Sequence, residues 1–179
     1  MYKVVIPSYR RSDIIEKKTL NALKKGNVKS ENIYIFVANE KERKIYEESV
    51  NKKLYREIIV GKKGIVNQRK FISNYFNEGE YIVSLDDDIE YLTKRVDNST
   101  LKKEVNLDKF FKNAFKLLKE NNLYLWGIYP VTNPLFMRNG PEVSKDLRFI
   151  IGVMHGYIVR KDKDLKVNNS TSTKEDYEQ

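Results

Sequence analysis

Short apolar runs alternate with amphipathic stretches along the first half of the chain. Four runs have the length and composition of buried strands, at residues 3–6, 33–38, 57–60 and 80–85. Between them lie segments with helical spacing of apolar positions, at residues 12–23, 40–51 and 66–76. This alternation predicts an α/β fold in which a mostly parallel sheet is flanked by helices.

The second half has a less regular pattern. A strongly amphipathic helix is expected at residues 107–121, a strand at 123–129, and further strands at 149–153 and 157–159. No linker or repeat divides the chain, so we expect one domain over residues 1–179. The polar tail at 168–179 carries a helix-start signal with no helix after it, so either the chain ends early or this tail is loosely ordered.

Composition excludes several classes of protein. With 40% apolar residues in 179, the chain can bury one sizeable core, and no apolar stretch approaches the roughly 20 residues of a membrane span. There is no cysteine, which excludes disulfides, thiolate catalysis and cysteine-based zinc sites. Any metal must therefore be held by oxygen atoms or by the single His155. The start of the chain lacks a secretory signal, so we expect a cytoplasmic protein.

A net charge of +9 favours an anionic partner, such as a nucleoside diphosphate, nucleic acid or an acidic surface. The lysines are scattered along the whole chain, however, and scattered lysines are also typical of an ordinary solvated surface. The charge alone therefore leaves a nucleic-acid-binding module open as one interpretation.

The most informative segment is residues 81–89 (YIVSLDDDI), where a buried strand runs directly into Asp86, Asp87 and Asp88. Adjacent carboxylates repel one another by about 1 kcal/mol or more per pair unless a cation lies among them. Mn²⁺ or Mg²⁺ would neutralise them and keep positions open for phosphate oxygens. The alternative is an acidic surface turn. In parallel sheets, the loops after residues 6, 38, 60 and 85 meet at one edge, which predicts a shared cleft.

These segments together resemble the glycosyltransferases of the GT-A type. Asp86 and Asp88 match the two positions of their Asp-x-Asp motif, and residues 4–9 (VVIPSY) resemble their first strand and loop. Residues 33–39 and 64–70 fall where the family has its second strand and a basic helix after a glycine. The likeness is greatest to glycosyltransferases associated with modified pyrimidines in phage and viral DNA.

The resemblance implies a role for each matching residue. Asp88 is expected to bind the metal and Asp86 to bind metal or ribose. Asp87 is counted with the donor-binding residues, where it would orient the other acids or cap a helix. A helical Arg69 is expected to pair with a phosphate, although helical arginines are more often surface residues. The remaining residues expected to contact the nucleotide-sugar are Pro7, Ser8, Tyr9, Arg10, Ala38, Asn39 and Gly64.

On the acceptor side the family implies a catalytic base from a late Glu-Asp pair, which Glu175 and Asp176 match in type and order. Alternatively, these acids favour a helix N-terminus. His155 lies between glycines and is a candidate for acceptor or metal contact, or a structural histidine. Trp126 is a candidate sugar-stacking residue, or part of the core.

The resemblance therefore implies a single GT-A, Rossmann-like domain, with residues 1–95 binding the donor and 96–179 the acceptor. The expected reaction is metal-dependent transfer from a nucleoside-diphosphate sugar, with UDP favoured, to a glycan, a protein or modified DNA. A viral or phage enzyme of this kind would act in the host cytoplasm. A nucleotidyltransferase is a further alternative, but no glycine-rich triphosphate loop of the usual form is present.

Overall fold

A six-stranded sheet forms the centre of the computed structural model, which describes residues 1–97, 99–129, 131–137, 143–144 and 149–162. The strands run in the order β3-β2-β1-β4-β8-β7. Their bounds are β1 (Tyr2–Pro7), β2 (Ile33–Val37), β3 (Glu57–Val60), β4 (Tyr81–Leu85), β7 (Leu125–Gly127) and β8 (Met154–Ile158). β1 to β4 are mutually parallel, and β8 is antiparallel to both β4 and β7. The predicted α/β class with a mostly parallel sheet is confirmed.

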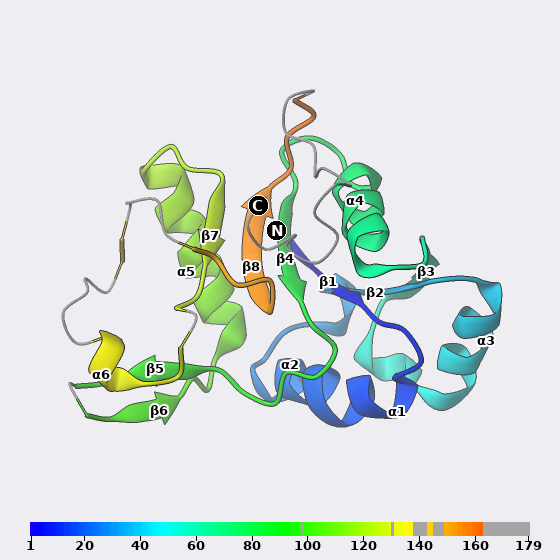
Figure 1. Cartoon of the computed structure of the whole chain (residues 1–179), viewed down its shortest axis with the longest axis horizontal. Coiled ribbons are helices and arrows are strands. Elements are labelled where there is room, and N and C mark those ends of the chain that lie inside the picture. Colours follow the sequence, from blue (N-terminus) through cyan, green and yellow to red (C-terminus); the bar gives the residue numbers. More distant parts are fainter. Residues whose placement is uncertain (98, 130, 138–142, 145–148, 163–179) are drawn as a thin grey trace.

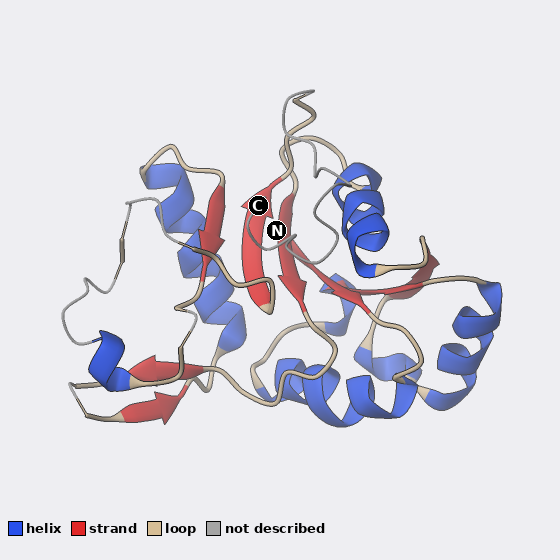
Figure 2. Ribbon diagram, viewed as in Figure 1, coloured by secondary structure: helices blue, strands red, loops and turns tan. Residues whose placement is uncertain are grey.

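Helices cover both faces of this sheet (Figures 1 and 2). One face carries α4 (Ile65–Tyr75). The other face carries the helical segments that lie before β2, β3 and β7 in the chain. These are α1 (Ser12–Ile15), the π-helical segment η1 (Glu16–Leu20), α2 (Asn21–Lys25), α3 (Glu40–Ser49) and α5 (Leu107–Glu120). Short 3-10 turns, η2 (Ser30–Asn32) and η3 (Lys52–Leu54), lie before β2 and β3.

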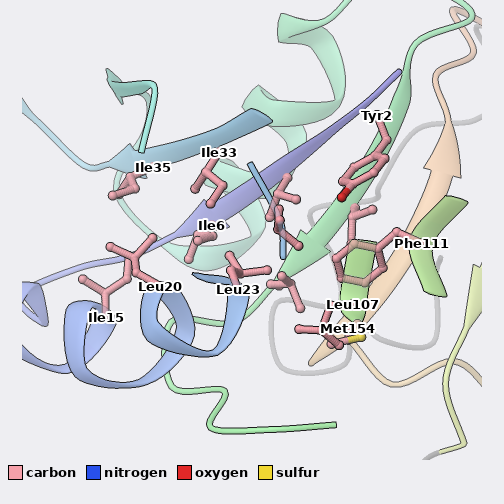
Figure 3. Close-up of a cluster of buried hydrophobic side chains, with 14 of the residues drawn as sticks. Tyr2, Ile6, Ile15, Leu20, Leu23, Ile33, Ile35, Leu107, Phe111 and Met154 are labelled. Carbon is pink, nitrogen blue, oxygen red and sulfur yellow. The ribbon is translucent and has the colours of Figure 1, made fainter. Parts of the chain in front are cut away.

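Alternation along the strands divides the core into two layers. In β1, the side chains of Val4 and Ile6 belong to the layer under α1, α2, α3 and α5, and Val5 belongs to the layer under α4. Figure 3 shows the first layer, in which Phe111 of α5 packs near Tyr2. Burial of each such aliphatic or aromatic side chain stabilises the fold by about 1.5–3 kcal/mol. The two layers therefore hold the sheet, including the edge where the site lies, in a fixed position.

The predicted strand at 149–153 is wrong, and the predicted strand at 157–159 covers only the end of the observed one. The structure has the single strand β8, centred on the gap between them, and it pairs along the whole of β4, from Leu85 with Met154 to Tyr81 with Ile158. The glycine at position 156 resembles a strand breaker in the sequence. In the fold it lies inside β8 because the indole of Trp126 covers it, and an added Cβ would lie 2.3 Å from that ring.

A small antiparallel hairpin extends from the end of the acidic loop. It consists of β5 (Thr93–Arg95) and β6 (Leu101–Lys103), and the short helix α6 (Pro134–Met137) lies beside it. The Arg95 side chain donates a hydrogen bond to the carbonyl of Met137, which joins the two pieces. Among the residues that the structure describes, no helix has both the length and the apolar character needed to cross a membrane.

Candidate functional site

The first and fourth strands are neighbours, so the loops that follow them meet at the carboxyl edge of the sheet. Val5 of β1 is level with Ser84 of β4, and both loops leave the sheet towards α1 and α2 (Figure 1). Beyond this level, the Ser8 hydroxyl donates a hydrogen bond of 2.6 Å to Oδ2 of Asp87. The structure thus brings together two segments that the sequence places almost 80 residues apart.

A closed ring of hydrogen bonds joins these two loops to α3. The Asp87 carboxylate can only accept, so Ser8 donates to it, and the Tyr46 hydroxyl donates to Ser8 Oγ over 2.7 Å. The backbone N–H of Arg11 donates to the Tyr46 hydroxyl over 3.0 Å, and Nη1 of Arg11 donates to the second Asp87 oxygen over 2.9 Å. Tyr46 is fully buried, and burial raises the pKa of its hydroxyl, which keeps the donor proton in place.

The backbone of the acidic loop is held separately by one hydroxyl. Thr19 Oγ1 donates to the Asp86 carbonyl over 2.8 Å and accepts from the Ile89 N–H over 2.8 Å. The N–H of Asp86 donates to the Val153 carbonyl over 3.0 Å. Thr19 lies in the π-helical segment η1, and such segments are frequent at functional sites. The loop that carries the three acids is therefore fixed at both ends.

The three acids divide into one inward and two outward side chains. The side chain of Asp87 is 8% exposed, whereas those of Asp86 and Asp88 are 34% and 46% exposed. Each outward carboxylate is near a guanidinium: Nη2 of Arg69 lies 3.5 Å from Asp86, and Nη1 of Arg11 lies 3.2 Å from Asp88. Asp87 is thus bonded to Ser8 and Arg11 inside the loop, and the other two carboxylates face the solvent. The roles expected for the three acids stay predictions.

This donor set fits a divalent cation that is shared with a phosphate ligand. In the described part of the chain, no three aspartate, glutamate or histidine side chains form a complete protein cage for a metal. Mg²⁺ and similar ions are commonly held by one or two carboxylates, with water and substrate phosphates as the other ligands. Asp86 and Asp88 supply carboxylates of that kind, and the two flanking arginines already show that positive charge is stable there.

The loop after β1 has an unusual backbone at Arg10. Its φ of 57° is left-handed, which costs a non-glycine residue about 1–2 kcal/mol. Glu42, which is buried, accepts a hydrogen bond of 2.9 Å from the Arg10 N–H and so holds this conformation. The neighbouring Tyr9 is 38% exposed, and the Arg10 guanidinium lies 5.0 Å from the centroid of its ring. Contact of Tyr9 and Arg10 with a nucleotide stays a prediction.

Other residues predicted to touch the donor have clear local roles. Asn39 caps α3 by accepting a bond of 3.0 Å from a backbone N–H in the first turn, and Gly64 precedes α4 with a φ of 89° that suits glycine. Buried Gln68 donates to the Val37 carbonyl over 3.1 Å, which ties α4 to the end of β2. Ala38 directly follows β2. Contact of Ala38, Asn39 and Gly64 with a nucleotide stays a prediction.

Arg69 extends from α4 to the start of the acidic loop. Its side chain is only 11% exposed, and Nη2 also donates a hydrogen bond of 3.2 Å to the Gly152 carbonyl. Its position is therefore internal to the site and differs from that of an ordinary surface arginine.

The acceptor-side candidates are placed differently. Trp126 is partly buried against the core and packs on three phenylalanines of α5, so of its two interpretations the structure favours core packing over sugar stacking. His155 is buried in β8, level with Ser84, and its ring stacks on Tyr157. This burial favours a structural role for His155, and its contact with an acceptor or a metal stays a prediction. Glu175 and Asp176 lie outside the described residues.

Sequence reasoning missed four contributors to the site: Arg11, Thr19, Tyr46 and Glu42. Tyr46 and Glu42 are on one face of α3, which is otherwise a charged surface helix, so the pattern gives no signal for them. Arg11 is marked only by being next to Arg10 in a loop that the resemblance covers.

The fold is that of known glycosyltransferase structures. The chain is similar to residues 1–349 of TarS from S. aureus, with a TM-score of 0.55 and 18% identity over 98% of this chain and 52% of that one. It is also similar to the mannosyltransferase PcManGT from Pyrobaculum calidifontis, solved with GDP-Man and Mn²⁺, with a TM-score of 0.57 and 14% identity over 88% and 44% of the two chains. The chain thus spans about half the length of these structures. These likenesses define the GT-A glycosyltransferase class of fold.

A more specific relationship comes from the sequence itself. The model of the TET-Associated Glycosyltransferase family matches residues 2–162, which is most of the chain. This protein therefore belongs to the TET-associated glycosyltransferase family. No curated protein sequence matches the chain.

Proposed function

We propose that this protein transfers a sugar from a nucleoside-diphosphate sugar, with a UDP-sugar favoured, in a reaction that depends on Mn²⁺ or Mg²⁺. The observation that carries the proposal is the arrangement of the acidic loop. Asp87 is turned inward and locked, so that Asp86 and Asp88 face outward at the sheet edge where the loop after β1 also ends. Of the similar structures, TarS was solved with UDP-GlcNAc and PcManGT with GDP-Man and Mn²⁺.

The side chains around the loop suit the parts of such a donor. The exposed ring of Tyr9 can stack on the base. Arg69 is preorganised by its bond to the Gly152 carbonyl and can pair with a phosphate oxygen. Asp86 and Asp88 would hold the cation, which neutralises the charge that develops on the departing diphosphate.

The bond changes of the transfer balance without a further co-reactant. In an inverting reaction, a carboxylate accepts the proton of the acceptor hydroxyl, and the acceptor oxygen forms a bond to the anomeric carbon. The bond from that carbon to the diphosphate breaks, and its electron pair leaves with the diphosphate. We assign the base to Asp176, with Glu175 beside it in sequence.

For the acceptor we favour modified DNA over a glycan or a protein. The β5–β6 hairpin begins five residues after the acidic triplet and places Lys94 directly opposite Lys102. Lys103 follows Lys102 in the strand and so lies on the opposite face of the hairpin, where its ammonium group is 4.4 Å from the centroid of the Tyr91 ring. Basic side chains interleaved with an exposed aromatic ring suit a phosphate backbone.

Donor hydrolysis tests the donor half of this proposal without an acceptor. UDP-, GDP- and TDP-sugars are incubated with the protein and Mn²⁺, and release of the free nucleotide is measured. We expect slow hydrolysis of one nucleotide class, loss of hydrolysis with EDTA, and at least a roughly 10-fold lower rate in Asp88→Asn. The proposal is refuted if no nucleotide-sugar raises the melting temperature of the protein in the presence of metal, since any ligand of the native state should do so.

A further inference from the structure

One guanidinium group bridges an inward and an outward acid of the loop. Nη1 of Arg11 donates to Asp87 over 2.9 Å and to Asp88 over 3.2 Å. The Arg11 side chain is 47% exposed, so the bridge can break without opening the core. The two bonds need only the two hydrogens of Nη1, and neither uses Nε or Nη2.

The backbone of Arg11 is held much more firmly than its side chain. Its N–H donates to the buried Tyr46 hydroxyl, and its carbonyl accepts bonds of 3.1 and 2.9 Å from the N–H groups of Ile14 and Ile15 in α1. A change of ligands at Asp88 would therefore move only the guanidinium end of Arg11. The bond to the buried Asp87 carboxylate provides a point about which that end can turn.

The position of this guanidinium conflicts with the proposed metal position. A divalent cation on Asp88 would share the same carboxylate with Arg11, and two positive charges at that distance repel each other. Displacement of Arg11 from Asp88 leaves Asp87 still bonded to Ser8, so no buried acid loses all its partners. The diphosphate that accompanies the metal would then bring new acceptor oxygens within reach of the released donors.

We propose that Arg11 occupies Asp88 as a stand-in cation in the unliganded protein, and that it turns to the diphosphate of the donor when a metal ion takes its place. This inference rests on the proposed function, because it uses the same metal position. Arg11 would weaken metal binding in the absence of nucleotide and strengthen nucleotide binding in the presence of metal. Metal and nucleotide would then bind cooperatively, since the displacement of Arg11 from Asp88 that metal binding requires also frees Arg11 to bind the diphosphate.

The two effects have opposite signs, which separates this role from a structural one. An exposed ion pair contributes a few-fold in affinity, so Arg11→Ala should bind Mn²⁺ about 2- to 5-fold more tightly than the wild type when no nucleotide is present. The same variant should bind UDP about 10-fold more weakly at saturating Mn²⁺, because it cannot form a charge-assisted hydrogen bond to the phosphate. A variant that merely disturbed the loop would weaken both.

Both affinities can be measured on the whole chain without turnover. Free Mn²⁺ is followed by electron paramagnetic resonance, and UDP binding by calorimetry at saturating Mn²⁺. The charge control is Arg43→Ala, which removes an arginine of similar exposure (43%) that pairs with Glu47 on α3. Arg11→Gln is the second variant, because it keeps a polar group near Asp87 if the alanine variant folds poorly, and it should show the same pair of signs.

The outcomes distinguish this inference from the proposed function. If Asp88→Asn binds Mn²⁺ as tightly as the wild type, the metal assignment fails, and the role of Arg11 fails with it. If Asp88→Asn loses Mn²⁺ while both Arg11 variants change the two affinities in the same direction, or match Arg43→Ala, the proposed function stands and the inference about Arg11 is wrong.

Discussion

Removal of the Tyr46 hydroxyl tests whether the buried ring of hydrogen bonds stabilises the site. Tyr46→Phe keeps the ring shape in the core but deletes two bonds, one from the Arg11 N–H and one to Ser8 Oγ. Each intramolecular hydrogen bond contributes about 1 kcal/mol net, so we expect the free energy of unfolding to fall by about 2 kcal/mol. For a chain of this size that corresponds to a melting temperature lower by about 4–8 °C.

Urea and thermal unfolding measure this change, and Tyr75→Phe is the matched control. The Tyr75 ring also packs among aromatic side chains, but its hydroxyl makes no hydrogen bond within the described part of the chain. The control should change the free energy of unfolding by less than about 0.5 kcal/mol, which is typical of a surface change. If Tyr46→Phe behaves like Tyr75→Phe, the ring of hydrogen bonds contributes nothing to stability, and Tyr46 does not help to hold Asp87 in place.

Three further predictions concern the rest of the molecule. Burial raises the pKa of Tyr46 and Tyr157 above the unfolded value of about 10, so their contribution to stability is complete below about pH 10. The free energy of unfolding should fall as the pH rises above about 10, which urea titrations at about pH 8 and about pH 10.5 would reveal, and a flat profile would contradict the assignment. Gly156→Ala forces a methyl group against Trp126 and should lower the free energy of unfolding by about 1–3 kcal/mol, whereas an unchanged urea midpoint would show that the indole can move freely. Neutralising the hairpin should weaken duplex DNA binding and reduce the slope of log K against log salt by about one for each phosphate that is no longer neutralised, and an unchanged slope would remove the hairpin from the DNA surface. The residues to replace by alanine are Lys94, Lys102 and Lys103.

Sequence reasoning recovered the first half of the sheet because its strands are buried on both faces. β3 was predicted with its observed bounds, and β4 within one residue, because continuous runs of apolar residues end abruptly at charged or turn residues. The same reasoning placed strands at 149–153 and 157–159 and left out residues 154–156, which form the first part of β8 around Gly156. Local pattern could not reveal that an indole from another strand fills the space above this glycine, since that packing depends on the tertiary fold.

The candidate site was predicted in outline and not in its connections. The acidic triplet is visible in the sequence, and its place after β4 follows from strand order. Which acid turns inward depends on partners that are distant in the chain: Ser8 is 79 residues from Asp87, and Tyr46 is 38 residues from Ser8. The spacing of apolar residues in α3 does not show whether Tyr46 only packs in the core or also forms hydrogen bonds through its hydroxyl. Long-range pairings of this kind become visible only when the chain is folded.

The Thr19 hydroxyl offers a way to loosen the acidic turn without altering a charge. Valine has nearly the same shape as threonine, so Thr19→Val would preserve the helix packing while both the Asp86 carbonyl and the Ile89 N–H lose their shared partner. Serine would retain that partner. A protein engineer could therefore tune the stiffness of the turn through one uncharged position, and could separate what rigidity contributes to ligand binding from what the carboxylates contribute.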